Sequence, residues 1–291
     1  MSGLLDPAFL ARLEKLDFTA RKILAGEFRG DVRTRRRGIG ALFREHKRYT
    51  QGDDLRFLDW NVYSRLGELL VKEFESEENL NLLLLLDASG SMAFGEHEKF
   101  SFARRVAAAL GFVALNRLAV VDLATLPDGA ARRRSFFGRA AVPEFFGALD
   151  GVKAEGALDI DAGVRTVLGA RRGRGLAVIV SDFFAESGYQ SAFRFLQHSG
   201  LRVAAVHVLD RLDLHPGLSG RLRLEDIETG RRMSRTVTPA MLAAYEEEVR
   251  SFCDGVERYC RGRDVAYVRL DTSWTLEKAI RSLLLRGGVL A

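Results

Sequence analysis

A nearly continuous apolar run, from Leu80 to Leu86, ends abruptly in a carboxylate and two hydroxyls. A run without polar alternation predicts a strand buried on both faces, as in a parallel sheet covered by helices. The predicted strands are 80–86, 118–125, 175–182, 201–209 and 265–270, with a short edge strand at 134–137; the predicted helices between and after them are 98–117, 142–149, 159–168, 189–198, 238–261 and 276–285. This alternation predicts an α/β fold with a doubly wound, mostly parallel sheet.

The residues before this run follow a different pattern. Asp6 and Pro7 predict the start of a helix that continues to about Leu24, because a capping aspartate followed by proline favours a first helical turn. Residues 38–65 show neither helical nor strand periodicity, although they are rich in arginine, aspartate and aromatic residues. Residues 69–75 have the pattern of an edge strand, with charges at its outer positions.

These patterns divide the chain into two parts. We expect an N-terminal helical and irregular extension, residues 1–79, packed on a core domain of residues 80–291. Within the core domain, alternating residues flank Glu228-Thr229-Gly230 and predict an inserted β-hairpin at about 218–238, outside the main sheet.

Composition narrows the class of protein. A chain of 291 residues that is 47% hydrophobic and 29% charged is typical of a soluble globular protein. No apolar run approaches the roughly 20 residues of a membrane helix, and the first residues lack the pattern of a signal peptide, so we expect a cytoplasmic protein. Cys253 and Cys260 fall in one predicted helix, too far apart for a disulfide, and are expected to be core thiols. The five histidines have no metal-ligand spacing, which argues against a zinc site.

The polar residues that follow the first buried strand are the strongest candidate site. Asp87, Ser89 and Ser91 lie at the carboxyl end of that strand, where open α/β sheets place their ligands. Their oxygens suit Mg²⁺ or Mn²⁺ better than zinc, and Gly90 permits a tight turn between them. The alternative is that a buried strand simply leaves the sheet through a polar turn.

The Asp-x-Ser-x-Ser spacing resembles the first loop of the metal-ion-dependent adhesion site in von Willebrand factor type A domains. That resemblance implies a sheet of six strands with metal loops at the carboxyl ends. It also implies that Asp182, which ends another buried strand, supplies the third loop. The second loop of the family supplies a threonine, but Ala157 and Leu158 stand there in this chain. Two alternatives follow: Asp159 compensates, directly or through water, or the site is weak or empty until a partner donates a carboxylate.

A second resemblance concerns the segment before the core domain. It resembles a bacterial family of unknown function in which such a block precedes a type A domain; the matching residues are Tyr49, Gly52, Asp53, Asp54, Arg56, Asp59, Trp60 and Arg65, followed by residues 71–75. The resemblance implies an adaptor or co-chaperone that serves a MoxR-type AAA+ ATPase. It leaves open whether the block is a docking surface or a brace for the sheet. An active site made of Asp54, Arg56, Asp59 and Arg65 is a further alternative.

The leading functional hypothesis is therefore a non-enzymatic interaction module that binds a carboxylate of a partner through a divalent ion. It would cooperate with a MoxR-type ATPase in assembling or remodelling an unknown client protein. The chain has no Gly-x-x-x-x-Gly-Lys-Ser/Thr phosphate loop, so any ATP would be hydrolysed by the partner. An Mg²⁺-dependent hydrolase or phosphotransferase that uses Asp87 and Asp182 is the second hypothesis. Nucleic-acid binding through Arg33–Arg37 is the third, and it is disfavoured because no aromatic residues are interleaved with the arginines.

Overall fold

The computed structural model of the protein describes residues 4–13, 42–49, 58–75, 81–95, 99–126, 129–169, 175–225 and 230–286. The chain forms two compact units: Arg29–Asn79 is one, and Met1–Phe28 with Leu80–Ala291 is the other. Each unit is described by itself.

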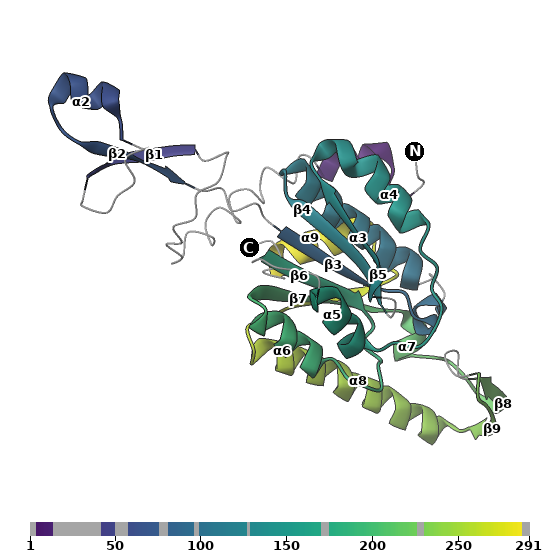
Figure 1. Ribbon diagram of the computed structural model, residues 1–291. Coiled ribbons are helices and arrows are strands. Elements are labelled where there is room, and N and C mark those ends of the chain that lie inside the picture. The colour runs from purple at the N-terminus through teal and green to yellow at the C-terminus, as the bar shows by residue number, and fades with distance from the viewer. Residues whose placement is uncertain are drawn as a thin grey trace. The chain divides into compact units, whose positions relative to one another are not determined.

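The larger unit is built on a six-stranded sheet in the order β10-β7-β6-β3-β4-β5 (Figure 1). Five strands are parallel, and β5 pairs antiparallel with β4 at one edge. The strands are β3 (Asn81–Asp87), β4 (Val120–Leu126), β5 (Gly129–Phe137), β6 (Gly175–Ser181), β7 (Leu201–Leu209) and β10 (Ala266–Asp271). The predicted α/β fold with a mostly parallel sheet is confirmed. The edge strand is longer than the predicted 134–137.

The central strand β3 shows why the apolar run has no alternation. Leu82, Leu84 and Leu86 belong to the core on one face of the sheet, whereas Leu83 and Leu85 belong to the core on the other. All five are buried. Successive side chains of a strand point to opposite faces, so a strand covered by helices on both sides has only apolar positions.

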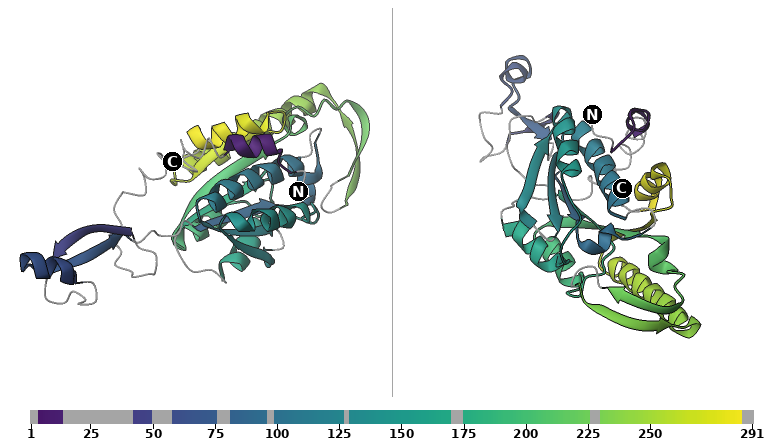
Figure 2. Two further views of the ribbon diagram at one scale, coloured as in Figure 1. Left: turned by 90° about the horizontal axis from the view of Figure 1, so that it is seen from above. Right: turned by 90° about the vertical axis from the view of Figure 1, so that its right-hand side faces the viewer.

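Helices cover both faces of the sheet. One face packs against α3 (Lys99–Asn116), α4 (Val142–Asp150) and α9 (Leu276–Arg286), and the other against α5 (Ile160–Gly169), α6 (Gln190–His198) and α8 (Pro239–Arg261). A short helix at residues 7–13 lies beside α9 and joins the first core (Figure 2). The rest of its predicted length, to Leu24, lies outside the described residues.

Smaller elements complete this unit. They are η2 (Gly90–Ala93), η3 (Arg139–Ala141), α7 (Arg211–Leu214) and a two-stranded sheet of β8 (Gly220–Glu225) and β9 (Arg232–Val237). The last pair is the predicted hairpin, and it is separate from the main sheet, as expected. In the described parts of the chain, no helix is both long enough and apolar enough to cross a membrane.

The smaller unit corrects one expectation. Residues 38–65 were expected to be irregular, yet they contain β1 (Leu42–Arg48) and α2 (Trp60–Leu66), and β1 pairs antiparallel with β2 (Leu70–Glu75). The last five residues of β1, from Arg44 to Arg48, are all polar, so neither apolar period appears in its sequence. The helix begins after Asp59, whose Oδ1 accepts a hydrogen bond from the Val62 amide at 3.3 Å.

Candidate functional site

Three of the predicted site residues, Asp87, Ser89 and Ser91, come together at the carboxyl end of β3. Asp87 Oδ1 accepts hydrogen bonds from the Ser89 amide at 2.9 Å and from Ser89 Oγ at 2.7 Å. Ser89 Oγ lies 3.0 Å from Ser91 Oγ. Gly90, between the two serines, is the first residue of the 3-10 helix η2, and this tight helical turn brings the two hydroxyls together. The end of β3 and the loop 88–95, here named the first loop, therefore bring side-chain oxygens of Asp87, Ser89 and Ser91 together, as their spacing predicts.

Asp87 accepts hydrogen bonds from hydroxyl groups and, among the described residues, forms no ion pair with a basic side chain. Its second oxygen, Oδ2, accepts a hydrogen bond from Ser181 Oγ at 2.5 Å. Asp87, Ser89 and Ser181 are fully buried, whereas Ser91 is half-buried. Burial, and then the nearby charge of Asp182, raise the pKa of Asp87 to about 7, although the serine hydrogen bonds oppose that shift. Among these four side chains, Ser91 alone is partly exposed to solvent.

The second loop, residues 151–159, lies directly against the first. The Glu155 amide donates to the Ala88 carbonyl at 2.7 Å, and the Gly90 amide donates to the Gly156 carbonyl at 2.8 Å. The two loops are therefore joined by backbone bonds where the family's threonine would stand. Leu158 is buried in the core and, like Ala157, has no side-chain oxygen.

Asp159 does not join the first-loop oxygens. Its Oδ1 accepts from the Ala162 amide at 2.9 Å, at the start of α5, and from Ser187 Oγ at 3.4 Å. Among its hydrogen bonds to the described residues, none reaches Asp87, Ser89 or Ser91. A carboxylate that satisfies amides at a helix N-terminus has a sufficient structural role.

The third loop, residues 182–189, is held in an uncommon conformation. Phe183 has a φ of +58°, which is rare for a bulky residue. Its side chain is fully buried against Tyr189, Phe193 and His207. Its amide donates to Ser181 Oγ at 2.8 Å. Burial of the phenyl ring offsets the backbone strain and fixes the direction in which the neighbouring Asp182 points.

Asp182 is paired with a lysine that the sequence did not single out. Lys99 Nζ lies 2.7 Å from Asp182 Oδ2 and 3.1 Å from Asp213 Oδ1. The lysine side chain is 2% exposed and the Asp182 side chain is 0% exposed. Burial alone would lower the pKa of Lys99. The nearby carboxylates of Asp182 and Asp213 outweigh that effect and raise the pKa above its usual value, so Lys99 is an ammonium. The third-loop carboxylate is therefore already neutralised.

The ion pair continues into a network at the end of β7. Asp213 Oδ2 accepts from the Asp210 amide at 2.8 Å, and Thr272 Oγ1 donates to Asp210 Oδ2 at 2.6 Å. Gly95, at the end of the first loop, has a φ of +117°, and a Cβ there would lie 2.7 Å from Asp210 Cγ. The first loop thus closes against this network at a position that only glycine fits.

The residues present fit a divalent ion only in part. Ser89 and Ser91 hydroxyls backed by the Asp87 carboxylate are hard oxygen donors of the kind that Mg²⁺ prefers. Asp182 is occupied by Lys99, and the second loop adds no side-chain oxygen. Among the described residues, no three His, Cys, Asp or Glu side chains gather in a way that would hold a metal. Any ion here depends on the two serines, Asp87, water and a ligand from outside.

The block before the core domain is described in part. Gly52, Asp53, Asp54 and Arg56 lie outside the described residues, as does Arg33–Arg37. Asp59 is buried and caps α2. The Tyr49 amide donates to the Leu69 carbonyl at 2.9 Å. Trp60 and Tyr63 are exposed and meet edge to face on α2, with Arg65 on the same short helix. Asp59 is thus a structural residue, whereas Trp60 is presented to the surroundings.

Sequence reasoning missed Lys99, Ser181, Asp210 and Asp213. One signal was available for Lys99, because a cation in the first turn of a helix opposes the helix dipole and requires a compensating partner. Ser181 directly precedes Asp182, but its role depends on the pairing of β3 with β6. The two cysteines are buried and free, and burial raises the pKa of Cys253, and that of Cys260 to about 12, consistent with core thiols.

Comparison with known proteins gives a family but no activity. Residues 45–252 match the model described as "Protein of unknown function DUF58". Uncharacterized proteins Mb1516 of Mycobacterium bovis and Rv1480 of Mycobacterium tuberculosis are each 30% identical over 288 residues, covering 92% of this chain and 87% of theirs. A solved structure of the conserved hypothetical protein BatB from Bacteroides thetaiotaomicron matches with a TM-score of 0.42 and 14% identity, over 73% of this chain and 100% of that chain. At this TM-score the match supports no argument. From the sequence matches, the chain belongs to the DUF58 family of proteins of unknown function.

Proposed function

We propose that this protein is a non-enzymatic interaction module of the von Willebrand factor type A kind, acting in the cytoplasm as an adaptor for a MoxR-type AAA+ ATPase. In this proposal it binds a carboxylate of a partner protein through a divalent ion held by the first loop. The observation that carries the proposal is the convergence of Asp87, Ser89 and the partly exposed Ser91 at the carboxyl end of β3.

The incomplete oxygen set supports a role for the partner. Two hydroxyls and one buried carboxylate leave most of the coordination sphere of Mg²⁺ to water and an external ligand. When bound, the ion would supply positive charge where a partner's aspartate or glutamate approaches. Ser89 and Ser91 would hold it, and Asp87 would orient their hydroxyls through the hydrogen bond to Ser89.

The hydrolase alternative has less support. Lys99 is a paired ammonium and has no free lone pair with which to act as a base. His207 is fully buried, and its Nδ1 lies 2.9 Å from the Tyr267 hydroxyl. Among the described residues, neither group contacts Ser89 or Ser91. A serine nucleophile requires a base within hydrogen-bonding reach.

The test of the metal site is thermal. Melting temperatures of the wild type, Asp87→Ala and Asp159→Ala are measured in Mg²⁺, Mn²⁺ and EDTA. An ion that binds only the folded chain stabilises it by about 2.7 kcal/mol at a hundred times its dissociation constant. We expect a rise of a few degrees in the wild type, its retention in Asp159→Ala and its loss in Asp87→Ala. A rise that disappears in Asp159→Ala alone would contradict the assignment of ligands.

The test of the partner is binding of the purified chain to the MoxR-type ATPase of its own genome, followed by gel filtration in Mg²⁺ and in EDTA. A complex that forms only in Mg²⁺ and is lost in Ser91→Ala supports the full proposal. A complex that also forms in EDTA keeps the adaptor role and removes the metal bridge. Absence of any complex removes the adaptor role.

A further inference from the structure

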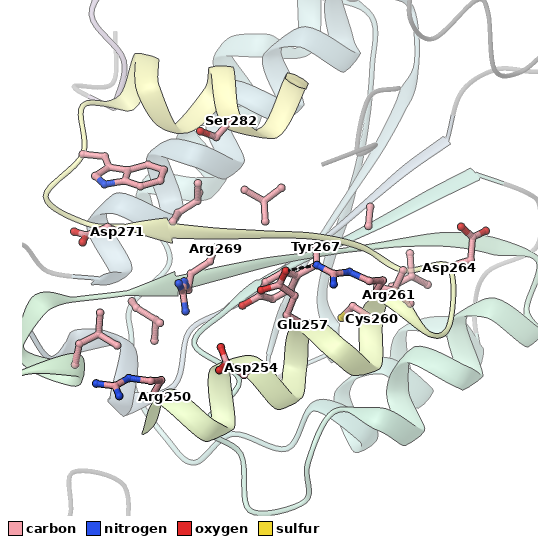
Figure 3. Close-up of a pocket in the computed structure, with 18 of the residues that line it drawn as sticks. Arg250, Asp254, Glu257, Cys260, Arg261, Asp264, Tyr267, Arg269, Asp271 and Ser282 are labelled. Carbon is pink, nitrogen blue, oxygen red and sulfur yellow. Dashed lines mark hydrogen bonds and ion pairs between the residues drawn. The ribbon is translucent and has the colours of Figure 1, made fainter. Parts of the chain in front are cut away.

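The edge of the sheet opposite β5 is open and recessed. Strand β10 is the last strand on that side, and a groove of about 1180 Å³ runs along it between α8 and α9. In Figure 3, β10 forms the floor of this groove, with α9 on one side and α8 on the other. Among the described residues, no strand pairs with the outer side of β10.

The direction of the β10 backbone follows from one hydrogen bond. The Thr272 amide donates to the Leu209 carbonyl of β7 at 3.0 Å. In a parallel ladder, alternate residues direct both their N–H and their C=O to the same neighbour. Leu270 and Val268, two and four residues before Thr272, therefore also face β7. The N–H and C=O groups of Tyr267, Arg269 and Asp271 face the groove.

Outward N–H and C=O groups on an edge strand form a template for another strand. The walls of this groove suit a polypeptide better than a nucleic acid. Arginines and carboxylates are nearly balanced in its lining, with Arg250, Asp254, Glu257 and Arg261 all on α8. Five carboxylates among the lining residues would repel a polyanion. On the other side, Trp274 provides an aromatic surface near the start of α9.

The recessed position decides between two possible occupants. A second copy of the chain would have to bring its own β10 to a strand spacing of about 4.8 Å. That strand is also recessed between its α8 and α9, so the helices of the two copies would meet before the strands. A single extended segment without flanking helices has no such obstacle.

We propose that this groove binds an extended segment of a partner protein, which pairs with β10 as a seventh strand of the sheet. Main-chain hydrogen bonds to Tyr267, Arg269 and Asp271 would give affinity, as in other complexes formed by strand addition. At about 3.3 Å per residue, a segment of about six residues spans β10. Alternate side chains would face Trp274 and the charged wall of α8. This site is independent of the first loop and of any metal ion.

The test uses a proline substitution that leaves the hydrogen bonds between β10 and β7 in place. Arg269→Pro removes one N–H that faces the groove and none that faces β7, and proline is tolerated at such edge positions. Arg269→Ala is the matched control, because it removes the same side chain and keeps the N–H. Peptides selected from a displayed library of random dodecapeptides on the wild-type chain are labelled with fluorescein, and their Kd values are measured by anisotropy in EDTA.

We expect selected peptides with alternating apolar residues, a Kd within about threefold of wild type for Arg269→Ala, and at least tenfold weaker binding for Arg269→Pro. Equal binding by Arg269→Pro and wild type, equal loss in both variants, or a selection that yields no peptide would overturn the proposal. N-methylation of successive peptide amides gives a second measurement that does not depend on folding of the proline variant. Only alternate positions should lose binding, and a uniform response would also overturn the proposal.

Discussion

Two neighbouring clusters at the carboxyl edge of the sheet stabilise a buried carboxylate in different ways. In the hydroxyl cluster, Ser89 and Ser181 donate hydrogen bonds to Asp87, and Ser91 contacts Ser89. In the ion-pair cluster, Lys99 places its ammonium between Asp182 and Asp213. A hydroxyl can also offer a lone pair to a cation, whereas an ammonium cannot. The hydroxyl cluster is therefore suited to an external ligand, and the ion-pair cluster is closed.

The largest expected effect comes from breaking the ion-pair cluster. Lys99→Met leaves two carboxylates without their cation, Asp182 fully buried and Asp213 nearly so. Removal of one partner from a buried pair typically costs about 3–5 kcal/mol. We expect a loss of that size in the free energy of unfolding, measured with urea. Lys99→Met combined with Asp182→Asn and Asp213→Asn should recover most of it.

The matched control for this variant is Arg165→Met, which breaks an exposed ion pair of 2.8 Å with Asp161. Exposed pairs contribute about 1 kcal/mol or less. Similar losses of unfolding free energy in Lys99→Met and Arg165→Met would show that the buried ion pairs of Lys99 contribute no more to stability than an exposed ion pair.

The next effect concerns His207, whose ring meets those of Phe183 and Phe184 beside the ion-pair cluster. Burial lowers its pKa from 6.5 to about 4. A depressed histidine pKa means that the unfolded chain binds the proton first, so stability falls as pH drops from about 6.5 to about 4. The shift corresponds to about 3 kcal/mol. We expect the free energy of unfolding of His207→Gln to vary less over this range than that of the wild type. If the free energies of unfolding of the two proteins changed equally with pH, His207 would not be the source of the pH dependence.

A smaller effect of opposite sign is expected in the hydroxyl cluster. The folded-state pKa of Asp87 is raised from 3.8 to about 7, so the folded chain binds the proton first. Its contribution to stability is therefore present at acidic pH and is lost as pH rises from about 4 to about 7. The shift corresponds to about 4 kcal/mol. In metal-free buffer at pH 8, we expect Asp87→Asn to be more stable than wild type by about half of that, because the asparagine amide group cannot accept one of the serine hydrogen bonds. A less stable variant at pH 8 would mean that ionised Asp87 is well solvated in the folded chain.

The sequence predicts the sheet better than it predicts the site. The apolar run at residues 80–86 and the similar runs that follow it along the chain identify the parallel strands, because these strands are covered by helices on both faces. The same reasoning fails for β1, whose last five residues are all polar. Asp87, Ser89 and Ser91 are found because they are local in sequence and their spacing brings them together.

The ion-pair cluster could not be predicted in this way. Lys99 is 83 residues from Asp182 and 114 residues from Asp213, so their contact depends on the order of strands in the sheet. The family resemblance implies that Asp182 is the third-loop carboxylate, but it gives no sign of a lysine partner. The pairing of strands brings a lysine to that carboxylate, and only the structure shows this.

The alternation of backbone direction along β10 also has a consequence for solvent exchange. The amides of Val268, Leu270 and Thr272 face β7, whereas those of Tyr267, Arg269 and Asp271 face the groove. Hydrogen exchange requires an amide that is not hydrogen-bonded. In the free chain, the amides of β10 should therefore exchange slowly and rapidly at alternate positions. These three fast amides form a built-in reporter at the edge of the sheet. Any occupant that pairs with β10 will slow them, whatever its sequence.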